Sequence, residues 1–329
     1  MGGIMCTAIS IKDKEHYFGR TLDLEHSYGE GIMITSQSYP LRYRHGETDA
    51  DHYAIIGTAI EKDGFPLYFE AANEKGLGGA GLNFADYAFY HPVRHDKRNI
   101  ESFELIPWVL SQCKNIDEVI RLIEKTNICG DVFDSELGAP TLHWIFSDGD
   151  ASLVVESVKE GLRLYRDECG VLTNSPEFSF HKTNLNNYIS LSAVSPQNRS
   201  EIPSLAPYSR GMGAIGLPGD CSSASRYVRA VFNKFNSTSG ESEEDKVCRF
   251  FHILGSVEQI EGCVRLDCGK TVRTVYTSCI NTSRGIFYYC TYNDRAIRAV
   301  SMSEKDKKSK ELIFYPMSHS QTIISDKKC

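Results

Sequence analysis

Short polar turns between successive strand-like segments constrain the fold of this chain more than any other feature of its sequence. Residues 6–11 (CTAISI) and 16–22 (HYFGRTL) flank the turn KDKE. Similar turns join the apolar segments within 141–167 and within 274–302. A tight turn leaves no room for a crossover connection, so neighbouring strands pair antiparallel. We expect antiparallel pairing throughout.

Two pairs of helices are expected between these groups of strands. Residues 100–113 precede residues 115–127, where Asn115 can cap a helix whose apolar residues recur at helical spacing. Residues 222–235 and 242–254 form the second pair, and each begins with serine. This alternation predicts an α+β fold of two stacked sheets with helices on the outer faces. We see no domain boundary and expect a single domain.

The charge and the hydropathy pattern exclude several classes of partner. The net charge is -7, without charge blocks apart from residues 303–312. Nucleic acid and anionic membranes are therefore not expected as partners. No apolar run is long enough to cross a bilayer, and the start lacks a charged region followed by an apolar one. Export is not expected.

The cysteines point to a reducing compartment. There are 11 of them, an odd number, and none forms a Cys-x-x-Cys motif. Cys263 and Cys268 are the nearest pair, with no histidines beside them, so neither disulfides nor zinc are expected. Buried structural thiols in a cytoplasmic protein without metal or cofactor are the simplest reading.

A glycine motif near the middle of the first half resembles a nucleotide-binding fingerprint. Gly76, Gly78 and Gly81 satisfy G-x-G-x-x-G. That motif needs a strand before it and a helix starting on it, whereas here a turn precedes it and residues 82–92 have aromatic strand character. We reject a nucleotide site and expect the glycines to admit a neighbouring backbone or substrate.

The first residues of the chain carry a candidate nucleophile. Cys6 follows Met5, so removal of Met5 or of all residues 1–5 would give Cys6 both a thiol and a free α-amine. If the hairpin turn spans four residues, Cys6 faces the region 21–23, and the Asp23 carboxylate could hold that amine. Strict alternation puts Arg20 on the opposite face from Asp23, so both face the thiol only if the strand bulges or ends after Leu22. An ordinary surface ion pair is the alternative for Arg20 and Asp23.

The α-amine is the most attractive base for this thiol. The ten histidines include no obvious catalytic partner, and His143 looks like a core residue. An α-amine has an unperturbed pKa of about 7.7–8.0, close to working pH. The expected chemistry is acyl transfer, in which a thiolate attacks an amide carbonyl and water then cleaves the thioester.

Several motifs together resemble a known family. MCTAI, FGRTLD, NEKGLGGAGLNF, TLHWIFSD, GVLTNSP, GLPGD followed by SSASR, and YTSC occur in this order between Met5 and about Met302. They resemble the choloylglycine hydrolase family of bile salt hydrolases and penicillin V acylases, within the N-terminal-nucleophile hydrolases. The resemblance implies an αββα sandwich. The chain departs from the family at its start, because family members begin at the methionine before the cysteine, whereas here MGGI precedes MCTAI. We therefore expect a single domain over residues 6–329 and a leader of residues 1–5 that is removed or not translated in the active form.

The resemblance also implies roles for individual residues. Cys6 matches the nucleophile, and Arg20 and Asp23 match the pair placed beside it. Asn83 matches a residue that lines the oxyanion hole and the amide side of the substrate. The remaining matches are Asn174, a second oxyanion donor, and Arg226, an arginine that supports the nucleophile.

The resemblance implies hydrolysis of glycine- or taurine-conjugated bile salts. Asn83 is typical of the bile salt branch, and Leu22, Phe133 and Leu137 fall in stretches that line the family's steroid pocket, although core packing would also explain them. Penicillin V or another N-acyl amide is the alternative substrate. A homotetramer is expected from the family.

Two other classes of function remain open. One is a non-catalytic binding protein, if Cys6 never becomes N-terminal. The other is a conventional cysteine hydrolase that pairs an internal thiol, such as Cys169 or Cys221, with a histidine.

Overall fold

The opening hairpin is present, with a tighter turn than expected. The structure is a computed structural model that describes residues 5–46, 48–49, 51–134 and 139–323. Strands β1 (Met5–Asp13) and β2 (Glu15–Leu24) pair so closely that Asp13 lies opposite Glu15. The expectation of a four-residue turn is therefore wrong, because Lys14 adopts a φ of 57° and reverses the chain almost alone. Cys6 pairs with Leu22, within the expected region.

The hairpin belongs to the first of two large sheets. This seven-stranded sheet has the order β14-β1-β2-β16-β17-β18, with β15 paired to β16. Its other strands are β14 (Val171–Leu172), β15 (Val264–Arg265), β16 (Thr271–Asn281), β17 (Ile286–Thr291) and β18 (Asp294–Ser301).

The second sheet has eight strands in the order β13-β12-β11-β8-β7-β6-β3-β19. Its strands are β3 (Gly31–Thr35), β6 (Ile55–Lys62), β7 (Phe65–Asn73), β8 (Gly78–Asn83), β11 (Leu142–Ser147), β12 (Ser152–Val158), β13 (Gly161–Asp167) and β19 (Leu312–Pro316). All pairs within the two large sheets are antiparallel, as expected.

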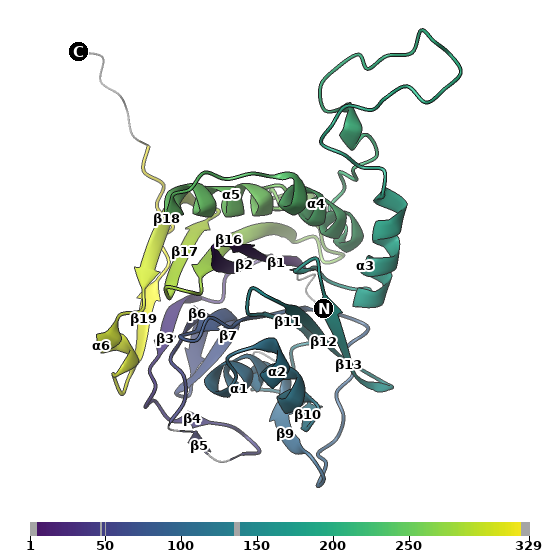
Figure 1. Ribbon diagram of the computed structural model, residues 1–329. Coiled ribbons are helices and arrows are strands. Elements are labelled where there is room, and N and C mark those ends of the chain that lie inside the picture. Colours follow the sequence, from purple (N-terminus) through teal and green to yellow (C-terminus); the bar gives the residue numbers. More distant parts are fainter. Residues whose placement is uncertain (1–4, 47, 50, 135–138, 324–329) are drawn as a thin grey trace, which may run out of the picture.

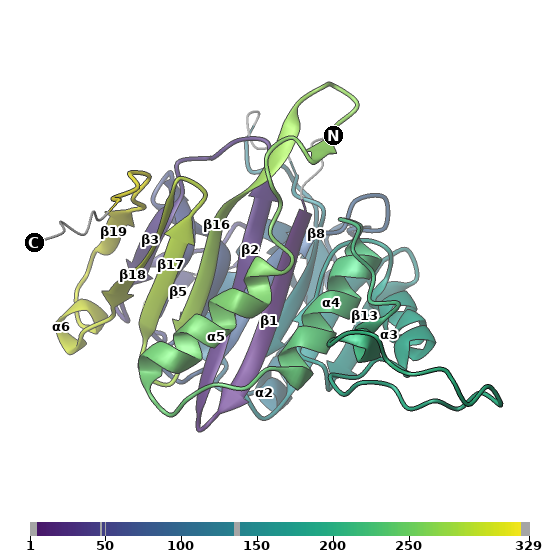
Figure 2. The same ribbon diagram turned by 90° about the horizontal axis from the view of Figure 1, so that it is seen from above.

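Helices cover the outer faces of the two sheets (Figures 1 and 2). Helices α4 (Ser223–Asn236) and α5 (Glu243–Gly255) lie over the first sheet, and α1 (Leu105–Gln112) and α2 (Ile116–Ile123) lie under the second. The α+β sandwich is thereby confirmed. The expected caps are also present, because Asn115, Ser222 and Ser242 each accept a backbone hydrogen bond in the first turn.

The structure differs from the expected elements at the ends of the first helix pair. The segment expected to be helical from residue 100 begins with β9 (Arg98–Glu101) and a 3₁₀ turn (Ser102–Glu104), and β10 (Thr126–Cys129) follows α2. β9 and β10 pair parallel, so antiparallel pairing throughout is wrong. The two intervening helices supply the long crossover that a parallel pair needs. The remaining short elements are β4 (Leu41–Arg42), β5 (Thr48–Asp49), α3 (Phe178–Leu185), α6 (Glu304–Lys307) and the 3₁₀ turns Asn186–Tyr188 and Met212–Ala214.

Gly78 of the glycine motif serves the packing between the sheets, and Gly79, which the motif does not require, serves the packing within the second sheet. Gly78 lies in β8, where a Cβ atom would meet the Phe18 ring at 2.7 Å, and a Cβ on Gly79 would meet the Phe146 ring at the same distance. Aromatic side chains therefore occupy the space beside Gly78 and Gly79, whereas Gly81 lines a pocket together with Cys6, where a ligand could approach it. The strand expected after Asn83 is absent among the described residues up to Arg98.

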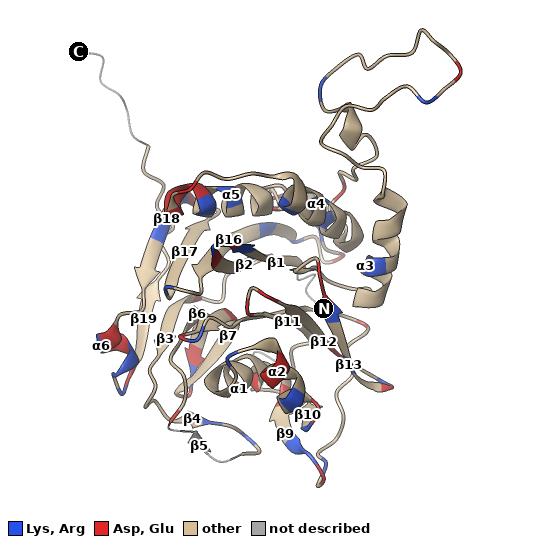
Figure 3. Cartoon of the chain, viewed as in Figure 1, with Lys and Arg blue, Asp and Glu red and all other residues tan. Residues whose placement is uncertain are grey.

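Positively and negatively charged residues are interspersed with each other along the chain (Figure 3). An acidic first turn of α5, containing Glu243, Glu244 and Asp245, complements the positive end of that helix dipole. Among the described residues, no helix is long and apolar enough to cross a membrane.

Candidate active site

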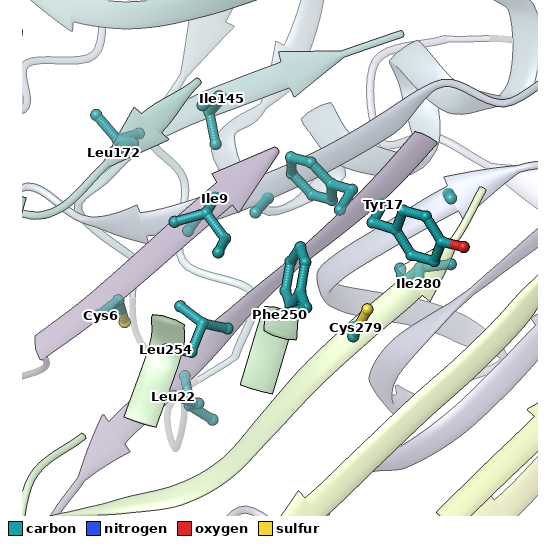
Figure 4. Packing of buried hydrophobic residues seen from close by; sticks show 14 of the residues in the cluster. Cys6, Ile9, Tyr17, Leu22, Ile145, Leu172, Phe250, Leu254, Cys279 and Ile280 are labelled. Carbon is teal, nitrogen blue, oxygen red and sulfur yellow. The ribbon is translucent and has the colours of Figure 1, made fainter. Parts of the chain in front are cut away.

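Cys6 lies near the start of β1 and belongs to a cluster of buried hydrophobic residues (Figure 4). Its side chain is fully buried. Because opposed residues of an antiparallel pair share a face, Cys6, Leu22 and Arg20 all face the second sheet. Asp23 faces the opposite way, towards the helices.

Arg20 spans the space between the two sheets. One Nη donates to the carbonyl of Gly81 at 2.6 Å and to that of Phe69 at 3.1 Å, while the other Nη donates to Cys6 Sγ. The carbonyls of two different strands thus fix the guanidinium, and its charge points at the sulfur. The match of Arg20 to a residue beside the nucleophile holds in the geometry, whereas the surface ion pair does not, because Arg20 is 1% exposed.

Asp23 approaches Cys6 from the helix side of the sheet. Its carboxylate accepts hydrogen bonds from Thr274 at 2.6 Å and Thr21 at 3.2 Å. β2 is unbroken to Leu24, and the register shift lies in the partner β16, between Thr274 and Tyr276. Strict alternation therefore holds in β2, with Arg20 and Asp23 on opposite faces as the sequence predicts, and no bulge or strand end brings both side chains to one face. Burial raises the pKa of Asp23 to about 6, against the lowering effects of Arg226, Thr274, Thr21 and Arg20.

Arg226 of α4 ties the backbone of Cys6 to Asn174. Its guanidinium donates to the Cys6 carbonyl, to Thr7 Oγ1 at 2.7 Å and to Asn174 Oδ1 at 2.7 Å. The Cys6 backbone nitrogen donates to the same Asn174 oxygen at 2.8 Å. Two donors on Oδ1 fix the orientation of the amide, so Nδ2 is its donor end.

Asn83 lies at the end of β8, opposite Asn174. Its carbonyl accepts from Asn174 Nδ2 at 2.9 Å, and its side-chain oxygen accepts from Thr141 at 3.0 Å. Phe84 donates its backbone N–H to Thr141, so in the alternating ladder both backbone groups of Asn83 point away from β11, to the side of Asn174. Five of the six expected catalytic residues thus contact another member of the group through the bonds described above, and the backbone of Asp23 hydrogen-bonds to Cys6.

The surroundings of Cys6 act on its thiol in opposite directions. Burial raises the pKa of Cys6, Arg20 and Arg226 lower it, and the Asp23 carboxylate raises it. With Met5 attached, the Cys6 nitrogen is a peptide N–H and cannot accept a proton. A free α-amine in this position would supply the missing base.

A pocket of about 800 Å³, open mouth included, begins at Cys6. Of the expected substrate-contacting residues, Leu22, Asn83 and Phe133 line it, while Leu137 lies outside the described residues. The other lining residues are mainly apolar: Leu24, Tyr28, Ile60, Leu67, Tyr68, Phe69, Phe103, Pro140 and Leu142, with Arg20 and Gly81 at the inner end. An apolar wall that begins at polar groups suits a ligand with a large apolar part and a polar end.

Sequence reasoning missed the groups that hold the expected residues in place. The carbonyls of Phe69 and Gly81 carry no side-chain signal. Glu70 lies beside Arg20 at 3.9 Å and is fully buried. A charged residue in the otherwise apolar segment PLYFEAA was a signal that could have revealed it.

The fold also brings together three side chains that could hold a metal ion, although the sequence shows no metal-ligand spacing. The ligand atoms of His45, Glu101 and Cys129 lie within 4.8 Å of one another. Glu101 is already engaged, because one oxygen is 2.5 Å from His45 Nε2 and the other accepts the Asp131 N–H at 2.8 Å. None of these three described residues lines the pocket at Cys6.

The two internal thiols considered as nucleophiles, Cys169 and Cys221, have surroundings that differ from those of Cys6. Burial raises the pKa of Cys169, and the groups that act on it are Asp167, Tyr227, Lys234 and Glu168. No histidine is among them. Cys221 contributes its backbone carbonyl, which accepts from Arg226 Nε at 3.1 Å.

Comparisons with known proteins agree with this geometry. Residues 6–315 match the model of the linear amide C–N hydrolases, choloylglycine hydrolase family. A bile salt hydrolase/transferase of Lactiplantibacillus plantarum is 49% identical over 314 residues, which cover 95% of this chain and 97% of that protein. A conjugated bile acid hydrolase of Lactobacillus acidophilus is 37% identical over 94% of this chain and 100% of its own.

Solved structures of this family have the same fold as this chain. A variant of the conjugated bile acid hydrolase from Clostridium perfringens has a TM-score of 0.89 at 33% identity, covering 98% of this chain and 99% of that one. A penicillin V acylase from Agrobacterium tumefaciens shares the fold, with a TM-score of 0.74 at 17% identity over 93% of this chain and 90% of that one. The resemblance noted in the sequence is confirmed, and the chain belongs to the choloylglycine hydrolase family of linear amide C–N hydrolases.

Proposed function

We propose that this protein hydrolyses glycine- or taurine-conjugated bile salts with Cys6 as an N-terminal nucleophile. The observation that carries the proposal is that Cys6 and Arg20 line the inner end of an apolar pocket, while Asn174 and Arg226 bond to Cys6 from behind that lining. The names of the relatives, bile salt hydrolase and conjugated bile acid hydrolase, indicate the substrate.

The reaction proceeds by acyl transfer to sulfur and then to water. The Cys6 α-amine takes the thiol proton, Sγ bonds to the amide carbon, and the tetrahedral oxyanion collapses with cleavage of the C–N bond. The α-ammonium gives its proton to the departing glycine or taurine. Water then attacks the thioester, loses a proton to the α-amine and releases the bile acid with a regenerated thiol.

Four neighbours have assigned roles in this proposal. Asn174 Nδ2 and the backbone N–H of Asn83 donate to the oxyanion, since both lie on the same side of β8. Arg20 stabilises the thiolate, and Asp23 holds the α-ammonium. Arg226 fixes both Cys6 and Asn174, because it bonds to each of them.

The active form begins at Cys6. We propose initiation at Met5 followed by methionine removal, or self-cleavage after Met5, with residues 6–329 as one domain. The intact mass of the protein, determined beside its rate on glycine-conjugated cholate, tests this. Activity should track the fraction that begins at Cys6, and full activity in protein that retains residues 1–5 would contradict both the maturation and the use of the α-amine.

Bile salts should be preferred to penicillin V. The pocket wall formed by Leu22, Phe133 and their apolar neighbours can cover a rigid steroid, at about 25 cal/mol per Å² of apolar surface removed from water. The smaller phenoxyacetyl group of penicillin V leaves much of that wall uncovered. Equal or higher kcat/KM on penicillin V would overturn the substrate and leave the cysteine mechanism intact.

A second outcome of the same intermediate is transfer to an amine, and one relative is named hydrolase/transferase. A thioester accepts an amine as readily as water when the amine is bound beside it. Mass spectrometry of reactions supplied with excess free amino acid detects new conjugates, which should be absent when Cys6 is replaced by Ala.

We propose a homotetramer in the cytoplasm. The segment after α3 projects from the body of the molecule (Figure 1), and it carries exposed apolar side chains that association would cover: Ile189, Val194, Ile202, Leu205, Tyr208 and Ile215. The ten cysteines within the described part of the chain are all free, which suits a reducing compartment. Sedimentation of the purified protein measures the oligomeric state.

A further inference from the structure

Glu70 is a buried carboxyl group that the proposed mechanism does not use. It lies in β7, between the two sheets, and its side chain is 0% exposed. One oxygen accepts from Thr58 Oγ1 at 2.7 Å, and the other accepts from the Tyr276 hydroxyl at 2.6 Å. The second oxygen also lies 3.9 Å from Arg20 Nε.

Arg20 is therefore shared between two acidic groups. One Nη donates to Cys6 Sγ, and Nε, which donates its hydrogen to the Thr21 carbonyl at 3.2 Å, lies 3.9 Å from the Glu70 carboxylate. The carbonyls of Phe69 and Gly81 hold the guanidinium in place whichever acid is ionised. Because its position is fixed, the net charge around Arg20 changes with the protonation of Glu70.

That net charge matters because the site excludes water. Arg20 is 1% exposed and Cys6 is 0% exposed, so the interaction between charges is only weakly screened. With a neutral Glu70, the full positive charge of Arg20 acts on the sulfur. With an ionised Glu70, the two form an ion pair with no net charge, which stabilises a thiolate much less.

We propose that Glu70 is a positioning residue that sets the acidity of the Cys6 thiol by controlling how much of the Arg20 charge acts on the sulfur. The inference rests on the proposed role of Cys6 as nucleophile and names a residue beyond it. Burial raises the pKa of Glu70 to about 7, against the lowering effects of Arg20, Tyr276, Thr58 and Ser278. The charge state of Glu70 therefore changes in the range where the enzyme would work.

Other charged groups face this pair from the surrounding strands. Tyr276 of β16 is the titratable group that bonds to Glu70, and burial raises its pKa far above the neutral range. Cys6 and Asp23 are the other groups that act on Arg20. Asp23 faces the helix side of its strand, whereas Glu70 contacts Tyr276 and Arg20 between the two sheets.

The test is the titration of Cys6 in the mature enzyme and in Glu70→Gln. Glutamine keeps an oxygen for the tyrosine hydroxyl and an N–H for Thr58, but it has no charge. Alkylation by iodoacetamide over pH 5–10, followed by mass spectrometry of the N-terminal peptide, reads Cys6 separately from the other ten cysteines. The midpoint in Glu70→Gln should fall by about one pH unit or more, and the wild-type curve should be broader because two groups titrate together.

Two further variants keep the test decisive. Tyr276→Phe removes one donor to the carboxylate, so Glu70 should ionise at higher pH and the thiol should be more acidic than wild type at pH 7.5, though less so than in Glu70→Gln. Asp167→Asn neutralises another buried carboxyl group, which bonds to the backbone of Cys169 and Val171, and should leave the Cys6 curve unchanged.

Superimposable titrations of wild type, Glu70→Gln and Tyr276→Phe would overturn the proposal. A fall in kcat without any shift of the Cys6 titration would also overturn it, because a merely structural role of Glu70 would lower kcat in that way. Because the alkylation of Cys6 needs no substrate, it tests the role of Glu70 independently of the proposed function. A shifted titration in a protein that hydrolyses no bile salt would refute the proposed function alone.

Discussion

Replacing Asp23 by Asn should stabilise the fold while it damages catalysis. The Asp23 carboxyl has a pKa of about 6 in the folded chain, raised by burial from 3.8. A group whose folded pKa is raised binds its proton more tightly in the native state, so stability from this group is present at low pH and is lost as the pH rises from about 4 to 6. Asparagine resembles the protonated acid and avoids that loss.

The size of the effect follows from the two pKa values. The shift of roughly 2.2 units corresponds to about 3 kcal/mol of unfolding free energy at pH 7.5, about 1.6 at pH 5 and about 0.5 at pH 4. For 329 residues, an unfolding entropy of about 2.1 cal/mol/K per residue converts 3 kcal/mol into a rise in Tm of about 4 °C. Urea titrations of both proteins at these three pH values measure the difference directly.

Comparing protein that retains Met5 with mature protein isolates the effect of the Cys6 α-amine on Asp23. In protein that retains Met5, the full difference is expected. In mature protein the Cys6 ammonium stabilises the ionised Asp23, so the gain should be smaller, and the reduction measures the ammonium–carboxylate interaction. Turnover of mature Asp23→Asn should fall because the amine loses its anionic partner.

The control has the opposite sign. Hydrogen bonds from Ser222 and Ser225 lower the pKa of Asp220 to about 2, so Asp220→Asn should destabilise the protein at neutral pH. An Asp23→Asn protein that is less stable at pH 7.5, or whose stability difference does not vary with pH, would refute the reasoning. Near-normal turnover would remove Asp23 from the chemistry.

Four shorter predictions concern the nucleophile, the oxyanion site, the pocket and the packing of the sheets. Cys6→Ser should lower kcat by orders of magnitude with an unchanged Tm, because a serine hydroxyl is far less acidic, and normal turnover would move the reaction elsewhere. Asn174→Ala should lower kcat by about 10²–10³ through loss of an oxyanion donor; a change confined to KM would contradict that role. Phe133→Ala should raise KM for a bile salt about 8-fold, if roughly 50 Å² of ring contact is lost at about 25 cal/mol per Å², with kcat nearly constant; a fall in kcat alone would exclude simple wall contact. Gly78→Ala should cost about 1–3 kcal/mol in urea unfolding, since its Cβ would meet the Phe18 ring at 2.7 Å, and an unchanged midpoint would show that the ring can move.

The sheets and the main helices could be predicted because their signals are local. The turn after Asp13 and the caps at Asn115, Ser222 and Ser242 lie next to the elements that they delimit. The parallel pair β9–β10 was missed because its strands are short and separated by two helices. Its pairing depends on how those helices return the chain, which no local pattern records.

The site could be predicted only where a motif carries it. Cys6, Arg20 and Asp23 lie in one hairpin, so pairing alone brought them to the right region. The contacts of Arg226 with Cys6 and Asn174 span 220 and 52 residues and follow from the docking of α4 on the first sheet. The support of Arg20 by Gly81 and Glu70 comes from the other sheet, and only the packing of the two sheets reveals it.

The hairpin that carries Cys6 also divides into a segment that cannot change length and a tip that can. Inserting one residue within β1 or β2 between Cys6 and Arg20 would turn every side chain beyond it to the opposite face. An insertion at Lys14 leaves the pairing below it intact, and this residue is exposed at the far end of the hairpin, about 26 Å from Cys6 at about 3.3 Å per residue. The tip is therefore a natural attachment point for a fluorophore, an affinity tag or a surface tether, whereas a fusion ahead of Cys6 would block the α-amine that the proposed mechanism uses.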